Sequence, residues 1–144
     1  MFIFSSAKEF DIIVNKMSIL IIDAAKDKIF LKIIYNNKSY TNEYLNNTEN
    51  FEKLSLILFN FLKKRNLGFD NISNILVNQG PGKYGGIRSS VSVSKALSIS
   101  NNIKLYGFCS KDVNGKNYDK VLDLFKKGVL IKKLIKLRYT NYNE

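Results

Sequence analysis

The segment Ile75–Leu97, with the sequence ILVNQGPGKYGGIRSSVSVSKAL, decides how this chain is interpreted. Its residues Gly80–Gly85 form a G-x-G-x-x-G pattern between an apolar run of strand character and a run that spacing predicts to be helical. A dinucleotide-binding turn opens the first strand–helix unit and has an acidic residue about twenty positions later. Here three predicted strands precede the pattern, and no acidic residue lies between Arg88 and Cys109. Pro81 also removes a backbone N–H from the loop. We therefore reject the dinucleotide reading.

The amino-acid composition excludes several further classes of site. The chain has 144 residues, a formal net charge of +11, one cysteine and no histidine. A disulfide framework and a Cys2His2 metal site are thereby excluded, and a reducing cytoplasmic location is expected. The charge favours weak attraction to RNA. Abundant Lys, Asn and Ile together with few arginines, however, indicate codon bias more than a dedicated nucleic-acid groove.

Hydrophobic patterning predicts an α/β fold. Asn36-Asn37 is a plausible two-residue hairpin turn, because asparagine tolerates positive φ, and Gly128 suits a helix C-cap. The SSVSVS run alternates like a strand, but a crossover is needed before the next strand, so a helix is expected there. The predicted strands are Ser18–Asp23, Lys28–Tyr35, Lys38–Tyr44, Ile75–Asn78 and Lys104–Phe108, and the helices are Thr48–Arg65, Gly86–Ser100 and Tyr118–Lys127. This order is that of a ribonuclease H-like lobe of the actin-like ATPase superfamily, with a mixed sheet of about five strands.

Three segments are expected along the chain. Residues 1–16 precede a second methionine, Met17, and are interpreted as a loose tail or the product of an upstream start. Residues 17–112 would form the ribonuclease H-like lobe. Residues 113–144 would be a linker, a returning C-terminal helix and a basic tail. No apolar run is long enough to span a membrane.

The first predicted helix is more apolar than one sheet contact requires. Between Phe51 and Leu62 the polar residues occupy less than half of the circumference, which indicates a second partner. The later helix carries small residues that would allow another helix to approach closely. The predicted partner interface consists of Leu56, Ile57, Phe59, Ser90, Ser94 and Leu97.

Few residues of the sequence are candidates for catalysis or for metal or cofactor binding. The G-K-[ST] arrangement of a Walker loop is absent, and the usual general base is missing without histidine. Asp23 ends the first strand, where ribonuclease H-like nucleases hold a metal, but it equally suits a turn residue that caps the step into Ala24–Asp27. No converging carboxylates are evident, and the DAAKDK loop has no phosphate-binding glycine. We expect no catalytic residue, no metal and no cofactor.

The residues SILIIDAAKDKIFLKII and NISNILVNQGPGKYGGIRSSVSVSKALSISNNIKLYGFCS resemble the TsaB family, the non-catalytic partner in threonylcarbamoyladenosine synthesis on tRNA. The family shows I-L-x-I-D-T-S near its start and a later G-P-G-S-F-T-G-x-R-x-G block. Lys83, Gly85 and Ser90 depart from that block, and Ala24-Ala25 replace Thr-Ser. The motif-loop residues of this chain are Asp23, Gly80, Pro81, Gly82, Tyr84, Gly86 and Arg88.

The resemblance covers residues 17–110 and implies a role and partners. The glycines would serve a tight turn and close packing, and the two helices would dock on the homologous catalytic transferase, TsaD. The ATPase TsaE would join the complex, tRNA would be contacted indirectly, and a homodimer through the same helices is the other arrangement. Most of the family's second lobe is absent, while LDLFKKGVLIKKLIKLRY resembles its closing segment. The alternatives are a metal-dependent nuclease that uses Asp23 and a degenerate remnant without function.

Overall fold

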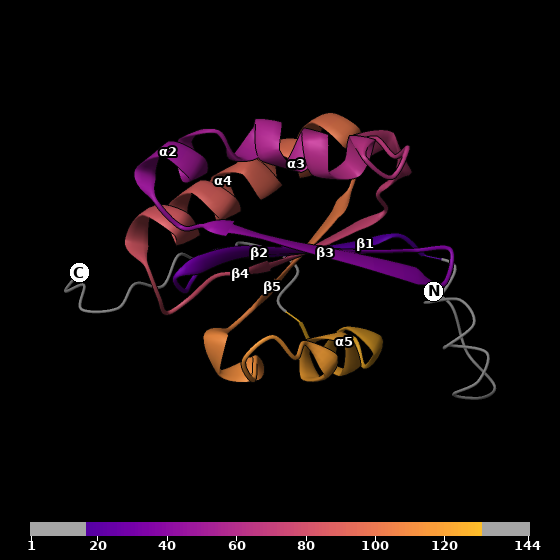
Figure 1. The fold of residues 1–144 in the computed structure, drawn as a ribbon. Coiled ribbons are helices and arrows are strands. Elements are labelled where there is room, and N and C mark those ends of the chain that lie inside the picture. Colours follow the sequence, from indigo (N-terminus) through magenta and orange to yellow (C-terminus); the bar gives the residue numbers. More distant parts are fainter. Residues whose placement is uncertain (1–16, 131–144) are drawn as a thin grey trace.

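A five-stranded mixed sheet forms the centre of the molecule, in the computed structural model whose residues 17–130 are described here (Figure 1). The strands follow the order β3-β2-β1-β4-β5. Their bounds are β1 Ile19–Asp23, β2 Lys28–Tyr35, β3 Lys38–Leu45, β4 Asn74–Asn78 and β5 Lys104–Phe108. Each predicted strand is confirmed within one residue at either end. The predicted tail 1–16 and the basic tail from residue 131 onward lie outside the described residues.

The first three strands form an antiparallel meander. β1 pairs with β2 and β2 pairs with β3, in the register Tyr35↔Lys38 that a two-residue loop demands. Asn36 and Asn37 have φ values of 51° and 64°, the positive values of a type I′ hairpin turn. The hairpin predicted from the Asn-Asn pair is confirmed.

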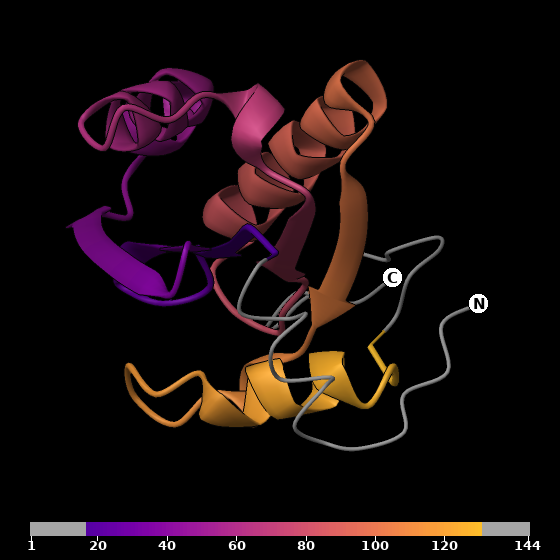
Figure 2. The same cartoon turned by 90° about the vertical axis from the view of Figure 1, so that its right-hand side faces the viewer.

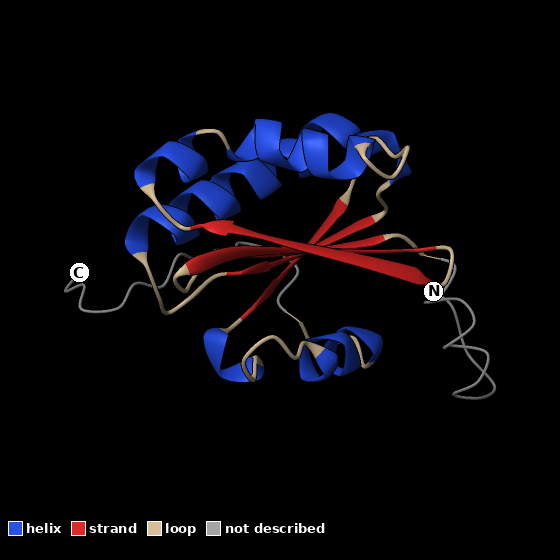
Figure 3. Cartoon of the chain, viewed as in Figure 1, coloured by secondary structure: helices blue, strands red, loops and turns tan. Residues whose placement is uncertain are grey.

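The other two strands run parallel to β1. β4 pairs with β1 and β5 pairs with β4, so each junction needs a crossover connection. Helices supply both crossovers and lie together on one face of the sheet, while a final helix lies on the opposite face (Figure 3). The helices are α2 Thr48–Glu52, α3 Leu54–Lys63, α4 Tyr84–Asn101 and α5 Asp119–Lys126, with short 3-10 turns η1 Phe69–Asn71 and η2 Ser110–Asp112.

The helix predicted over Thr48–Arg65 is instead two helices. The side chain of Asn47 caps α2 by accepting from the N–H of Asn50, as the cluster of capping residues indicates. The chain then turns at Lys53, whose φ and ψ are −106° and 19°. The carbonyl of Phe51 accepts a hydrogen bond from the hydroxyl of Ser89 in α4. A contact between helices thus takes the carbonyl that a continuous helix would use internally.

The SSVSVS segment is helical, as the topology predicts. The buried residues of α4 follow helical spacing and are mostly small, namely Gly86, Ile87, Ser90, Val91 and Ser94. They let α4 lie close to the sheet and to the α2–α3 pair (Figure 2). The main core lies between these helices and the sheet, with Leu54, Leu58 and Phe61 of α3 fully buried.

A second apolar cluster lies on the opposite face. Tyr118 and Val121 at the start of α5 pack against Ile21, Leu76 and Phe108 of the sheet. Gly128 has a φ of 71° and donates to the carbonyl of Phe125, which confirms the predicted C-cap. The helix predicted over Tyr118–Lys127 is observed as α5, Asp119–Lys126, and it covers the sheet face that the crossover helices leave open.

Candidate functional site

The glycine-bearing loop joins β4 to α4 at the end of the sheet where the parallel strands finish. Gly80 has a φ of 103°, a conformation that suits glycine, and its N–H donates to the side-chain oxygen of Asn78. The N–H of Lys83 donates to the carbonyl of Ala25 in the loop after β1, over 2.9 Å. The loop is therefore joined to the β1–β2 connection by a backbone hydrogen bond.

Two of the glycines permit this close approach. A Cβ atom at Gly82 would collide with the backbone of Ala25, and one at Gly86 would collide with the carbonyl of Ala24 and the side chain of Asn46. Asn46 in turn donates to the carbonyls of Ala24 and Lys26, at 2.7 Å each. The loop packs on protein backbone, as expected for glycines that serve a tight turn.

Asp23, one of the predicted motif residues, is buried and accepts hydrogen bonds through both carboxylate oxygens. Its side chain is 2% exposed. One carboxylate oxygen accepts from the N–H of Ala25 at 3.1 Å and from the amide of Asn78 at 3.0 Å, and the other accepts from the hydroxyl of Tyr118 at 2.7 Å. Asp23 thus caps the turn that follows β1 and joins β1, β4 and the start of α5.

The remaining carboxylates do not converge on Asp23. Among residues 17–130, no group of three or more His, Cys, Asp or Glu side chains is placed to hold a metal ion. Asp112 accepts from the N–H of Cys109 and pairs with Lys120, and Asp27 pairs with Lys83. Because Asp23 already accepts three hydrogen bonds, the described residues give the nuclease alternative no supporting geometry.

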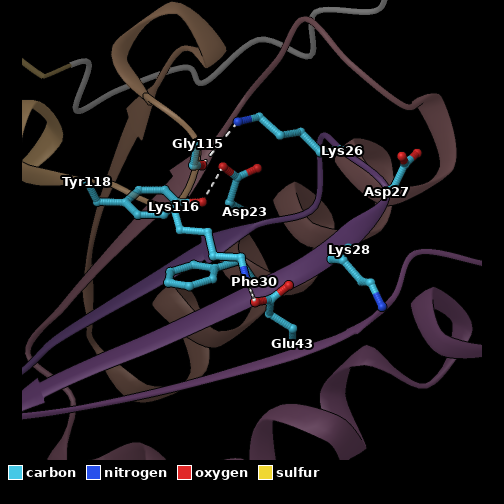
Figure 4. A pocket seen from close by; sticks show the side chains of 9 residues that line it. All are labelled: Asp23, Lys26, Asp27, Lys28, Phe30, Glu43, Gly115, Lys116 and Tyr118. Carbon is cyan, nitrogen blue, oxygen red and sulfur yellow. Dashed lines mark hydrogen bonds and ion pairs between the residues drawn. The ribbon is translucent and has the colours of Figure 1, made fainter.

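A pocket of about 260 Å³ opens beside Asp23 (Figure 4). Phe30 and Tyr118 stack within it, with ring centroids 4.6 Å apart. Lys116 pairs with Glu43 of β3, and Lys26 donates to the carbonyl of Gly115. These contacts hold the segment Asn114–Tyr118 on the sheet, so most polar groups of the pocket already bind one another.

Tyr118 is protonated in this environment. Burial, together with the neighbouring Asp23 carboxylate, raises the pKa of Tyr118 far above its ordinary value. The hydroxyl is therefore a fixed hydrogen-bond donor, which suits a structural role. It is poorly suited to act as a general base.

Tyr84 and Arg88 lie on the exposed side of the first turns of α4. The guanidinium of Arg88 donates to the hydroxyl of Tyr84 at 3.1 Å and lies 5.9 Å from the centre of its ring. Pro81, also exposed, provides its carbonyl to the hydroxyl of Ser110. Among the predicted motif residues, those that are buried are Asp23, Gly80 and Gly86, and those that are exposed are Pro81, Tyr84 and Arg88, while Gly82 is half-buried.

The residues of the predicted partner interface differ in their exposure to solvent. Leu56 and Phe59 of α3 are 56% and 46% exposed, while Ile57 and Leu97 are half-buried. Ser90 and Ser94 are 0% exposed, because α4 turns these small residues toward the core of its own chain. This placement corrects the expected interface: the two serines allow close packing within the chain, and their side chains offer no accessible surface.

Several important residues were not identified from the sequence. Asn46, Asn78 and Tyr118 complete the hydrogen bonds around Asp23 and the loop, but each comes from a distant segment. Ile99, 85% exposed on α4, is a further apolar residue on the helical layer. Its apolar character within a serine-rich helix was the available signal.

A protein-family model described as "TsaD: tRNA N6-adenosine threonylcarbamoyltransferase" matches residues 45–121, more than half of the chain. Curated tRNA N6-adenosine threonylcarbamoyltransferases also match. That of Bacillus thuringiensis is 36% identical over 56 residues, which are 39% of this chain and 16% of that protein. That of Clostridioides difficile is 38% identical over 56 residues, 17% of its length. The chain therefore matches about a sixth of the length of these relatives.

Among solved structures, YeaZ from Pseudomonas aeruginosa superposes with a TM-score of 0.60 at 13% identity, over 65% of this chain and 44% of that chain. A second Pseudomonas aeruginosa structure, titled as similar to peptidase YEAZ, gives the same TM-score over 43% of its length. YeaZ is a TsaB protein. The expected ribonuclease H-like fold and the resemblance to TsaB are thereby confirmed at the level of fold. In the described part of the chain, no helix combines the length and apolarity needed to cross a membrane.

Proposed function

Because this chain belongs to the family described as TsaD, tRNA N6-adenosine threonylcarbamoyltransferase, we propose that it takes part in threonylcarbamoyl modification of tRNA as a TsaB-type, non-catalytic subunit. Its fold, which is that of YeaZ, supports the TsaB type. So does the motif block, in which Gly86 and Arg88 match the TsaB pattern. The subunit docks on the catalytic transferase, which carries the reaction and contacts the tRNA.

The observation that carries the docking proposal is the exposed apolar surface of the α3–α4 layer. Leu56, Phe59 and Ile99 are about half or more exposed, although each is large and apolar. The two helices contact each other and cover the same face of the sheet (Figure 2). Exposed apolar side chains gathered on one layer are typical of a protein interface. We call these three residues the helical docking surface.

A non-catalytic role is supported by the chemistry of the buried site. Asp23 is fully hydrogen-bonded, Tyr118 is held protonated, and the loop glycines contact protein backbone. Each group is thus engaged in holding the lobe together. We assign the described residues no catalytic role and no bound cofactor, and a TsaE-type ATPase would be recruited by the assembled complex.

The test is co-purification of the full chain with the catalytic subunit encoded in the same genome, followed by a threonylcarbamoyl-transfer assay on tRNA. A stoichiometric complex that stimulates transfer is expected. The double variant Leu56→Asp/Phe59→Asp should lose the complex while it keeps its far-ultraviolet circular dichroism. Val129→Asp is the matched control, because it makes the same change at an exposed apolar residue beyond α5 and should leave the complex intact.

Two results would overturn the proposal. The first is a cooperatively folded chain that forms no complex with the transferase. The second is a complex that survives the double variant on α3. Sedimentation of the chain alone distinguishes a homodimer, since a dimer through the helical docking surface would also dissociate in the double variant.

A further inference from the structure

The outer edge of β3 is a second surface with unused binding capacity. β3 ends the sheet, and all eight of its residues pair with β2 on one side. Within residues 17–130, no strand pairs with its other side. An open edge of this length is a template for an additional strand.

The register shows which backbone groups the edge offers. In an antiparallel ladder, alternate residues direct their N–H and C=O groups toward the neighbouring strand. The N–H of Asn46 donates to the carbonyl of Asp27, so the even-numbered residues of β3 bond to β2 and the odd-numbered residues face outward. The pair Tyr35↔Lys38, which closes the hairpin, is in the same phase.

The end of this edge nearest α2 is closed by side chains. The N–H of Glu43 donates to the side-chain oxygen of Asn42, and the carbonyl of Leu45 accepts from the amide of Asn50. The outward-facing groups of Ser39 and Thr41 have no such cover among the described residues. The open part of the edge therefore centres on these two residues.

A groove of about 450 Å³ lies between Tyr44 of β3 and the helix α3. It is lined by Tyr44, Ile57, Asn60, Lys63 and Lys64. Ile57 and Tyr44 are half-buried and pack against the main core, so the floor of the groove is apolar. This groove lies on the flank of α3 that faces β3, whereas Leu56 and Phe59 project from other positions around the same helix.

The rim of the groove is positively charged. Lys63 and Lys64 line it, and no acidic residue among residues 17–130 does. Arg65 follows, with its guanidinium 5.2 Å from the ring of Tyr40 and donating to the carbonyl of Phe61. The one acidic residue of β3, Glu43, is already paired with Lys116. Within the part of the chain that the structure describes, the groove therefore has a positive charge that no lining carboxylate compensates.

We propose that the edge of β3 and this groove bind an extended acidic segment of a partner protein by strand addition. Its backbone pairs with Ser39 and Thr41, an apolar side chain enters between Tyr44 and Ile57, and its carboxylates lie near Lys63 and Lys64. Residues two apart in a strand point to the same face, so apolar and acidic side chains at every second position of the segment both reach the groove. The proposal does not depend on docking of the transferase on the helical docking surface.

Charge argues against two other occupants. A second copy of this chain would bring another net charge of +11 against the same basic edge. RNA would use the lysines, but it has no need of an open row of backbone N–H and C=O groups. The juxtaposition of an open strand edge, an apolar floor and a basic rim favours an acidic peptide.

The probe is a fluorescent peptide of eight residues, the length of β3, in which valine and glutamate take turns at every second position, with threonine at the positions between them. Its binding to the full chain is followed by anisotropy, with a lysine–valine peptide and a labelled oligouridine as comparison probes. Thr41→Pro removes an outward N–H without removing a bond to β2, and Thr41→Ala is its matched control. The double variant Lys63→Glu/Lys64→Glu reverses the charge of the groove rim. The double variant Lys126→Glu/Lys127→Glu makes the same change of charge at the end of α5 and is its control.

The acidic peptide should bind, and the lysine peptide should not. Thr41→Pro and the rim variant should each weaken binding about tenfold, while both controls bind as the unaltered chain does. Circular dichroism establishes that every variant is folded. The proposal would be overturned if the acidic peptide did not bind, or if Thr41→Pro left its affinity unchanged. It would also be overturned if the lysine reversals at the rim and at α5 weakened binding equally. Oligouridine that competes with the peptide and binds the Thr41→Pro variant normally would also overturn it, in favour of RNA. A dimer of the chain that Thr41→Pro dissociates would overturn it in favour of a second copy.

Discussion

The hydroxyl of Tyr118 donates a 2.7 Å hydrogen bond to the carboxylate of Asp23, a residue 95 positions earlier in the chain. Tyr118 precedes α5, and Asp23 ends β1, so this bond ties the helix on one face of the sheet to the loop that supports the opposite helical layer. The same carboxylate accepts from Asn78 of β4. Asp23 is therefore a junction of three elements that sequence alone places far apart.

Removal of this carboxylate should destabilise the lobe. Asp23→Ala leaves the Tyr118 hydroxyl, the Asn78 amide and the Ala25 N–H without their acceptor, which should lower the free energy of unfolding by about 2–4 kcal/mol. Urea denaturation measures the loss. Asp27→Ala is the control, because the Asp27 side chain is exposed and its ion pair with Lys83 is worth little. Equal stability of the two variants would contradict the assigned role.

The stability contributed by Tyr118 should depend on pH. Burial and Asp23 raise its pKa in the folded chain, so this contribution is complete below the pKa of an unfolded tyrosine, about 10, and declines above it. Tyr118→Phe lacks the ionisable group but loses the hydrogen bond. The difference in unfolding free energy between the unaltered chain and Tyr118→Phe should therefore shrink by about 1.4 kcal/mol per pH unit above about pH 10. A constant difference from about pH 8 to about pH 11 would refute the coupling.

Gly86 should tolerate no side chain. Its absent Cβ leaves room for the carbonyl of Ala24 and the side chain of Asn46. Gly86→Ala should lower the free energy of unfolding by about 2–3 kcal/mol despite the better helix propensity of alanine. Ser92→Ala, at an exposed position of the same helix, should be neutral or slightly stabilising. Thermal melting of both variants measures the contrast, and a stabilised Gly86→Ala would show that the loop can move away.

Much of the fold could be predicted from local sequence patterns and from the order of the predicted elements. Asn36 and Asn37 fix the first hairpin because a two-residue turn with positive φ permits a single register, and β-branched runs mark β1 and β4. The requirement for a crossover before β5 identified α4 correctly against its own alternating pattern. For the hairpin and the two strands, a residue's neighbours in sequence carried enough information, whereas α4 was identified from the order of the elements.

Tertiary contacts determined what the sequence did not reveal. The break between α2 and α3 accompanies a hydrogen bond from Ser89, and the burial of Ser90 and Ser94 depends on the direction in which α4 faces. The position of Asp23 at a strand end was predicted, but its bond to Tyr118 requires knowledge of where α5 packs. Helical periodicity identifies faces of a helix without saying which other element covers them.

The hairpin turn itself should respond to substitution at Asn37. Its φ of 64° is favourable for glycine and costly for alanine. Asn37→Gly should raise the free energy of unfolding slightly, and Asn37→Ala should lower it by about 1 kcal/mol. Urea denaturation of the two variants gives the comparison. Opposite signs of the two effects are the expected result, and a stabilised Asn37→Ala would contradict the left-handed conformation.

Charge placed on α3 and on α4 should have different consequences. Ser94 is fully buried, so Ser94→Asp puts an unpaired carboxylate in the core and should lower the free energy of unfolding by more than about 3 kcal/mol. Phe59 is 46% exposed, so Phe59→Asp should leave the lobe folded, with a melting temperature within a few degrees of the unaltered chain. Scanning calorimetry of the two variants tests this. Loss of a transferase complex in Phe59→Asp would then report on docking, whereas the same loss in Ser94→Asp would reflect unfolding. A stable Ser94→Asp chain would mean that α4 presents a different face to the sheet.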